Sequence, residues 1–206
     1  MTLCDGTVLH RIRALIDIYL GWKFVESGEL GGWVEKEDNL SHIGNCWVYG
    51  NAKVYGNAEV YGYADVYGNA EVCGNAEVRG NAEVCGNAVV RGNANVCGDA
   101  HVFKKDHVLV IGPIGSRSDF TTFMRNKSGE ILVKCGCFFG TADEFLTKVQ
   151  NTHGDSKYTV VYRAAVALAV EQIDTTPETE DDISATNHIA DDACGSWFMS
   201  RFTKTE

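Results

Sequence analysis

A hexapeptide repeat constrains the fold of this chain more than any other feature of its sequence. The repeat reads Gly-Asn-Ala-x-Val-x and runs from Gly44 to Val102, with valine at every sixth position from 48 and glycine at every sixth position from 44 to 98. A period of six fits neither the 3.6-residue turn of an α-helix nor a meander with variable turns. It predicts a coil of three short parallel strands, with about eighteen residues per turn and roughly three turns between 44 and 102.

The alternation of side chains along a strand assigns an orientation to each position of the repeat. Valine and the alanine two residues before it, such as Ala58 and Val60, point to the same side and are expected to form the interior. Glycine and asparagine fall at the corners, where a positive φ costs little for glycine and is tolerated by asparagine. The large number of glycines, 22 in the chain, is therefore structural.

The pattern resembles the hexapeptide-repeat, left-handed parallel β-helix family, whose motif is an aliphatic residue followed four positions later by a small one. The pairs from Val48 with Ala52 to Val96 with Ala100 conform to it. The resemblance implies a left-handed coil, and it implies trimeric assembly. It does not fix a function, because this fold serves acyltransferases, carbonic anhydrases and plain scaffolds.

The segments that flank the repeat extend the resemblance to about 170 residues. Residues 10–15, 28–35 and 39–41 resemble the N-terminal portion of uncharacterised hexapeptide-repeat proteins of tailed phages, and residues 108–173 resemble the C-terminal module of some of them. This resemblance implies a viral origin and brings no established activity with it.

The expected fold is therefore mainly β. It consists of an N-terminal cap (1–43), a left-handed parallel β-helix (44–105), a small α+β domain (106–173) and an acidic tail (174–206). In the α+β domain we expect strands at 108–111, 120–124 and 130–134 and helices at 142–150 and 156–173, the first opened by a capping box from Thr141 to Glu144. Val161, Ala165, Leu168 and Ile173 should lie on one face of the second helix.

The charge balance narrows the choice of partners. The chain has 28 acidic against 18 basic residues, a net charge of −10, of which six lie in the tail. Long nucleic acid and anionic membranes are poor partners for such a surface, although a small phosphorylated ligand on the folded body is compatible with it. No apolar stretch is long enough to span a membrane, and we expect reduced cysteines and a location in the cytoplasm of the infected host cell.

The side chains that follow each inward valine form an outward row with an unusual composition. Residues eighteen apart should share a face, which places tyrosines and cysteines beside arginines. The row comprises Tyr49, Tyr55, Tyr61, Tyr67, Cys73, Arg79, Cys85, Arg91, Cys97 and Phe103. One interpretation is a homo-oligomer interface. Another adds a ligand between subunits, with Tyr55, Tyr61 and Tyr67 stacking on a base while Arg79 or Arg91 binds phosphate.

A second candidate pocket lies after the repeat, at residues 112–118. Two glycines with Ser116, Arg117 and Ser118 offer backbone amides, hydroxyls and a guanidinium to an anion, while an ordinary hairpin connection is the alternative reading.

The residues give less support to a catalytic function than to a binding function. His101 would be the general base of a hexapeptide-repeat acyltransferase, but the repeat lacks the long extruded loop usual in those enzymes. A zinc site would need a third histidine besides His101 and His107, and Cys135 and Cys137 lack zinc-ribbon spacing. We therefore expect no cofactor and no metal.

These observations favour a non-enzymatic phage protein that acts by binding. The expected role is counter-defence, either by sequestration of a host nucleotide immune signal or by inhibition of a host defence protein. The alternatives are an acyltransferase and a structural or virion scaffold protein.

Overall fold

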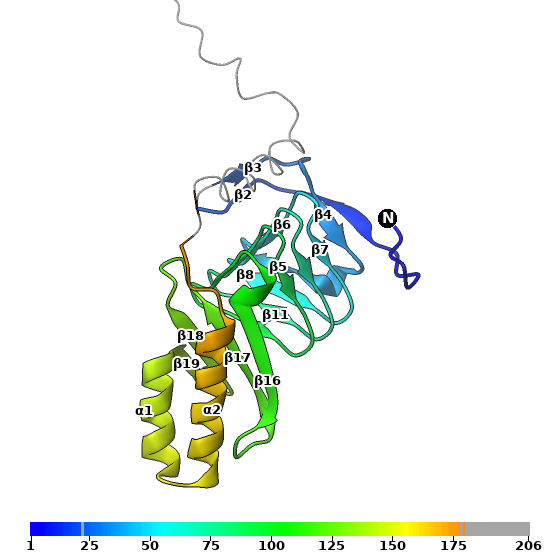
Figure 1. Cartoon of the computed structure of the whole chain (residues 1–206). Coiled ribbons are helices and arrows are strands. Elements are labelled where there is room, and N and C mark those ends of the chain that lie inside the picture. Colours follow the sequence, from blue (N-terminus) through cyan, green and yellow to red (C-terminus); the bar gives the residue numbers. More distant parts are fainter. Residues whose placement is uncertain (22, 178, 180–206) are drawn as a thin grey trace, which may run out of the picture.

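The computed structural model describes residues 1–21, 23–177 and 179. Its main body is a parallel β-solenoid of about four turns, followed by a small module of four antiparallel strands and two helices (Figure 1). The expected tail, apart from its first residues up to Pro177 and Thr179, lies outside the described residues.

Three parallel sheets form the faces of the solenoid, and each turn contributes one strand to each face. Face 1 contains β4 (Leu30–Val34), β7 (Lys53–Val54), β10 (Glu71–Val72) and β13 (Val89–Val90). Face 2 contains β5 (Leu40–Gly44), β8 (Glu59–Gly62), β11 (Glu77–Val78) and β14 (Asn95–Val96). Face 3 contains β6 (Trp47–Val48), β9 (Asp65–Val66), β12 (Glu83–Val84) and β15 (His101–Val102).

Backbone hydrogen bonds join each turn to the next. The amide of Glu71 donates to the carbonyl of Ala88 at 3.0 Å, and the amide of Cys73 donates to that of Val90 at 2.9 Å. Parallel pairing begins earlier than the repeat itself, because Trp33 and Val34 pair with Lys53 and Val54. The solenoid is therefore one turn longer than the three turns expected, and its first two strands come from the segment expected to serve only as a cap.

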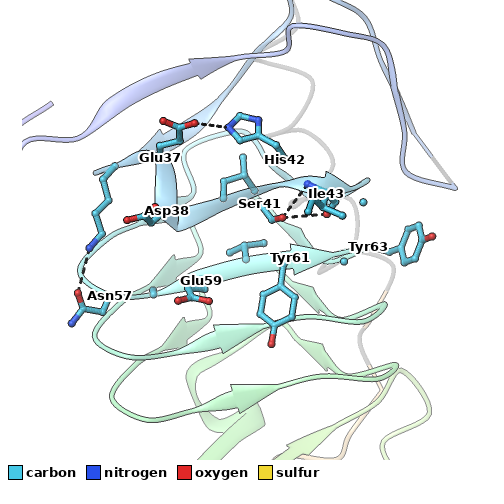
Figure 2. A pocket seen from close by; sticks show the side chains of 15 residues that line it. Glu37, Asp38, Ser41, His42, Ile43, Asn57, Glu59, Tyr61 and Tyr63 are labelled. Carbon is cyan, nitrogen blue, oxygen red and sulfur yellow. Dashed lines mark hydrogen bonds and ion pairs between the residues drawn. The ribbon is translucent and has the colours of Figure 1, made fainter.

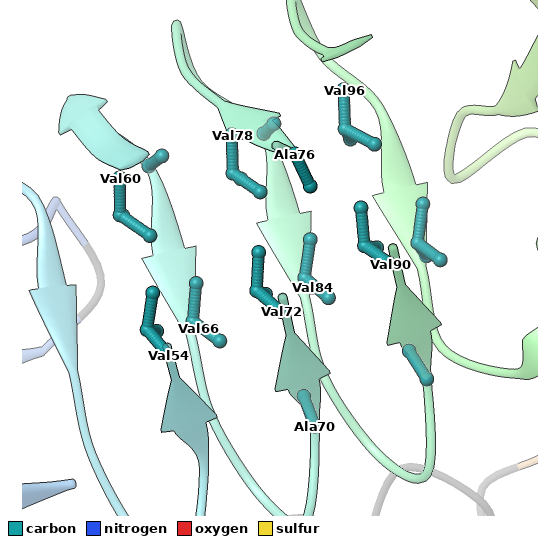
Figure 3. Packing of buried hydrophobic residues seen from close by; sticks show 14 of the residues in the cluster. Val54, Val60, Val66, Ala70, Val72, Ala76, Val78, Val84, Val90 and Val96 are labelled. Carbon is teal, nitrogen blue, oxygen red and sulfur yellow. The ribbon is translucent and has the colours of Figure 1, made fainter. Parts of the chain in front are cut away.

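The interior of the solenoid consists of the alanines and valines of the repeat, as the alternation predicts. Every inward valine from Val48 to Val102 is at most 1% exposed, and the alanines from Ala52 to Ala100 are at most 2% exposed. Figure 3 shows these side chains stacked in rows from one turn to the next. All ten glycines from Gly44 to Gly98 have a positive φ at the corners.

The N-terminal segment covers part of the first turn. Strand β1 (His10–Arg13) pairs antiparallel with β4, and β2 (Ile18–Tyr19) forms a hairpin with β3 (Phe24–Val25). Ala14 and Val25 pack with Trp47 and Tyr49 on the outside of face 3. The edge strand of face 1 is thereby paired, which removes one site of unwanted strand addition.

The C-terminal module packs against the last turn. Its sheet consists of β16 (Val108–Ile114), β17 (Asp119–Arg125), β18 (Ile131–Cys135) and β19 (Phe138–Thr141), in that order. Met124 and Leu132 join the solenoid core, whereas Phe123 and Val133 pack against helices α1 (Ala142–His153) and α2 (Lys157–Gln172). The sheet is thus buried on both faces.

The module matches the expected elements in outline and departs from them in detail. The capping box is present, with the Thr141 hydroxyl accepting from the Glu144 amide. Strand β19 was not expected, β16 continues through the residues expected to turn, and α1 runs three residues further than 142–150. Val161 and Leu168 are exposed whereas Ala165 and Ile173 are buried, so the expectation that these four residues share one face of the second helix is wrong.

Candidate functional site

The predicted ligand-binding residues of the repeat lie on three different faces. The strand pairings place Tyr55 and Arg91 on face 1, Tyr61 and Arg79 on face 2, and Tyr67 on face 3. Within one chain the structure therefore does not bring the five together. A site built from them would need residues from more than one subunit.

Three of these tyrosines have the same partner, a glutamate sixteen residues later on the next turn. Tyr55 donates its hydroxyl hydrogen bond to Glu71, Tyr61 to Glu77 at 3.1 Å, and Tyr67 to Glu83 at 3.3 Å. Burial, followed by interaction with the glutamate, raises the pKa of Tyr61 above its usual value. The three hydroxyls thus form hydrogen bonds between successive turns of the solenoid.

The guanidinium of Arg79 lies beside a carboxylate that already serves two other donors. Glu77 Oε2 lies 3.8 Å from Arg79 Nε and accepts from Tyr61 and, at 2.8 Å, from the Asn95 side-chain amide. A carboxylate this close neutralises much of the positive field that a phosphate would need. Arg91, by contrast, is exposed.

Part of the outward row is not available at the surface. Tyr49, Cys85 and Cys97 are 2%, 1% and 3% exposed. The N-terminal segment packs on Tyr49, and Cys85 lies against His101 of the next turn. Tyr49 stacks on Tyr67, with ring centroids 4.9 Å apart. The stacking of residues eighteen apart was therefore predicted correctly. The expectation that the entire row is exposed is wrong.

His101 lies in an enclosed polar cluster on face 3. It is 7% exposed, and its Nε2 atom lies 3.6 Å from Cys85 Sγ and 3.7 Å from Glu83 Oε2. Lys127 of the module donates to the other oxygen of Glu83 at 2.6 Å. A general base must reach the proton that it abstracts, and this enclosure leaves His101 poorly placed for an acyl acceptor.

The second predicted pocket is a hairpin tip. Residues 115–118 form the turn between β16 and β17, and Ser116, Arg117 and Ser118 are all exposed. Tyr162 of α2 lies beneath this turn, close to Gly115. The three residues are adjacent, as expected, but they line neither the pocket between residues 36–44 and 57–63 nor the pocket between β19 and α1.

A large pocket lies on face 2, where the regular coil is interrupted. It has a volume of about 1090 Å³ and is open to solvent between residues 36–44 and 57–63. In the pairing of β5 with β8, Leu40 lies opposite Val60 and Gly44 lies opposite Gly62. Strand β5 therefore has two more residues than β8 between these two pairs. The resulting bulge projects Ile43, which is 84% exposed (Figure 2).

A second irregularity lies beside the bulge, at Tyr63. Elsewhere the corner asparagines stack, as where Asn57 donates to Asn75 and Asn75 donates to Asn93, both at 3.2 Å. Tyr63 occupies the position that asparagine holds in most hexads, and it is 63% exposed. Ile43 and Tyr63 thus place two large apolar side chains at one rim of the pocket (Figure 2).

The charge of the pocket is mainly negative. The residues that line it include three carboxylates, those of Glu37, Asp38 and Glu59, and one ammonium, that of Lys36. The Lys36 ammonium donates to Asn57 at 3.3 Å. His42 lies 3.3 Å from Glu37 in an exposed pair, which contributes little stability. Apolar groups beside carboxylates suit a cationic, amphipathic partner and repel a phosphate.

The sequence reasoning missed this pocket although the signals were present. Leu40 and Val48, both in the inward register, are eight residues apart instead of six, and Tyr63 replaces an asparagine. Both are departures from the period, and the outward positions of the regular hexads do not include them.

Comparison with models of known protein families finds no match to this chain, and comparison with curated protein sequences finds none either. Among the described residues, no group of histidine, cysteine and acidic side chains is arranged to hold a metal ion. No helix in the described part has the length and apolar character needed to cross a membrane.

Proposed function

We propose that this chain is a non-enzymatic bacteriophage protein that inhibits a host defence protein by binding it in the cytoplasm of the infected cell. The viral origin, the left-handed coil and assembly as a trimer follow from the resemblance of the repeat and its flanks to phage hexapeptide-repeat proteins. The observation that carries the binding role is the acidic pocket with Ile43 and Tyr63 at its rim.

The local chemistry supports a protein partner over a nucleotide. Exposed aliphatic and aromatic side chains surrounded by polar groups are the usual composition of a protein contact. Strand β5 is also the terminal strand of face 2, so one edge of its backbone is available for strand addition. A cationic segment of the partner would pair with Glu37, Asp38 and Glu59 while its apolar residues cover Ile43.

Affinity purification from host cells tests the proposal. Tagged wild-type protein and the variants Ile43→Asp and Ile16→Asp are expressed in parallel, and the proteins retained are quantified by mass spectrometry. Ile16 is a matched control, because it is 70% exposed and does not line the pocket. We expect a host defence protein in stoichiometric amount with wild type and with Ile16→Asp, and its loss with Ile43→Asp.

Two results would overturn this proposal. One is full retention of the host protein by Ile43→Asp, which would move the contact elsewhere. The other is tight calorimetric binding of cyclic nucleotides or ADP-ribose-type signals that Arg79→Ala abolishes, which would establish sequestration of a signal instead.

A further inference from the structure

Helix α2 carries apolar residues on the side that faces solvent as well as on the side that faces the core. Tyr162, Val166 and Ala169 are buried against α1 and the sheet. A surface helix normally carries polar residues on its opposite side. The exposed side instead presents an apolar stripe, which we call the α2 stripe, formed by Val160, Val161, Ala164, Ala167 and Leu168.

The α2 stripe is large enough to require an explanation. Val160 is 65% exposed and Leu168 is 52% exposed, and both lie within the same 16-residue helix. Contiguous apolar groups of this kind mark contact sites more often than they mark solvent-exposed surface. Arg163, on the flank of the helix, donates to the side-chain oxygen of Gln150 in α1 at 2.9 Å.

The order of residues along the stripe is self-complementary about Ala164. Val160 precedes Ala164 by four residues and Leu168 follows it by four; Val161 and Ala167 are displaced by three. If two copies of α2 lie antiparallel with Ala164 at the two-fold axis, each valine faces Leu168 or Ala167 of the other copy. Small residues at the centre allow helix axes to approach to about 8 Å.

The charged residues at the two ends follow the same symmetry. Lys157 and Glu171 are exposed and lie seven residues on either side of Ala164. In the antiparallel arrangement each Lys157 ammonium lies beside Glu171 of the second copy, so two ion pairs close the contact. A parallel arrangement would instead place like charges together, which is unfavourable.

We propose that the α2 stripe is a homodimer contact in which two copies of this chain pair antiparallel about Ala164. The same patch serves both copies, as a two-fold interface requires. This inference does not depend on the partner proposed above, because no residue of the face 2 pocket belongs to α2. A trimeric contact through the solenoid is compatible with it.

Disulfide trapping tests the geometry. The variant Ala164→Cys places two thiols at the two-fold axis, within the reach of a disulfide when the helices are in contact. Val170→Cys is the matched control, since Val170 is 54% exposed on the same helix but lies outside the stripe. Because Cys4 and Cys137 are exposed, the linked peptides must be identified by mass spectrometry.

We expect Ala164→Cys to form a symmetric link through the introduced thiol in most molecules after mild oxidation, and Val170→Cys to form none. Equal rates of linking in the two variants would overturn the proposal. The trap is read on a denaturing gel, so the result is independent of any other subunit contact.

Charge reversal provides a second readout that leaves the core untouched. Lys157→Glu replaces two ion pairs by two repulsive pairs in a symmetric dimer, and we expect about a tenfold weaker dimer constant in sedimentation at low salt. Adding Glu171→Lys should restore the wild-type value. Failure of the double variant to recover, with helical content unchanged, would exclude the antiparallel register.

Discussion

The solenoid and the C-terminal module bury their apolar residues in different ways. In the solenoid, small alanines and valines repeat with one spacing, and each buried side chain has an equivalent on the turns above and below. In the module, the core is centred on a few large rings, Phe123, Phe145 and Tyr162, each in a unique environment. The solenoid is therefore a sum of similar small contributions, whereas the module depends on single residues.

The surface of the regular hexads also differs from that of the irregular parts of the molecule. Along the regular hexads, outward tyrosines are tied to glutamates and corner asparagines are tied to one another. Large exposed apolar groups occur where this regularity ends, at Ile43, Tyr63 and the α2 stripe. The regular hexads thus pair their outward polar groups with one another, whereas the irregular parts expose large apolar side chains.

The largest effect is expected from truncation of an aromatic ring in the module. Phe145→Ala should lower the free energy of unfolding by about 3–5 kcal/mol, because it leaves a cavity between α1, α2 and the sheet. Urea unfolding measures the loss, and Phe24→Ala, at a half-exposed ring, is the control with an expected loss below about 1 kcal/mol. A loss of equal size in both variants would contradict the assignment of the module core.

Truncation of an inward valine should cost less and should cost the same on successive turns. Val78→Ala removes two buried methyl groups at about 0.8 kcal/mol each, so an unfolding free energy lower by about 2 kcal/mol is expected. Val60→Ala, one turn earlier on the same face, should match it to within about 0.5 kcal/mol. A difference above about 1 kcal/mol would show that the turns are not energetically equivalent.

Two corner glycines allow the steric cost of an added side chain to be measured apart from the cost of its positive φ. Gly74 and Gly92 have similar φ values of 74° and 70°, but an added Cβ at Gly74 would lie 2.9 Å from the Gly92 nitrogen, whereas at Gly92 it would meet nothing within 4 Å. Gly74→Ala should therefore destabilise the protein by about 1 kcal/mol more than Gly92→Ala does. Thermal unfolding of the pair checks this, and equal losses would indicate that the stacked corners can separate without cost.

A pH-dependent effect, an alkaline loss of stability, is expected in the first turn. Burial raises the pKa of the Cys46 thiol from 9.0 to about 11. A raised pKa in the folded state favours the neutral thiol, so the associated stability is present below pH 9 and is lost as pH rises towards about 11. Stability measured from pH 8 to 11 should decline less steeply in Cys46→Ala, and an unchanged slope would contradict the assignment.

The fold was predictable where the sequence repeats. The inward positions, the glycine corners and the eighteen-residue stacking follow from the period alone, as does the pairing of Glu71 with Lys53 and Val89. The first turn was not predicted, because Val34 and Leu40, although six residues apart, are shifted by two residues from the register that begins at Val48. Strand β19 was missed because the glycines and aromatic residues around Phe138 give no clear alternation.

The candidate site was predictable only in part. The period indicates which outward residues share a face, but it does not show that Glu77 lies beside the guanidinium of Arg79 or that the N-terminal segment packs on Tyr49. These facts depend on contacts between segments distant in sequence. The four residues expected on one face of α2 do not share it, because a helix with apolar residues on both sides has no periodicity that identifies a single apolar face.

Hydrogen exchange of the complex recovered from host cells tests most directly whether binding occurs where the repeat is interrupted. The account predicts that the partner slows exchange in peptides covering 36–44 and 57–63, and leaves peptides from the regular turns between 71 and 96 unchanged. Protection confined to the regular turns, with 36–44 exchanging as in the free protein, would contradict it.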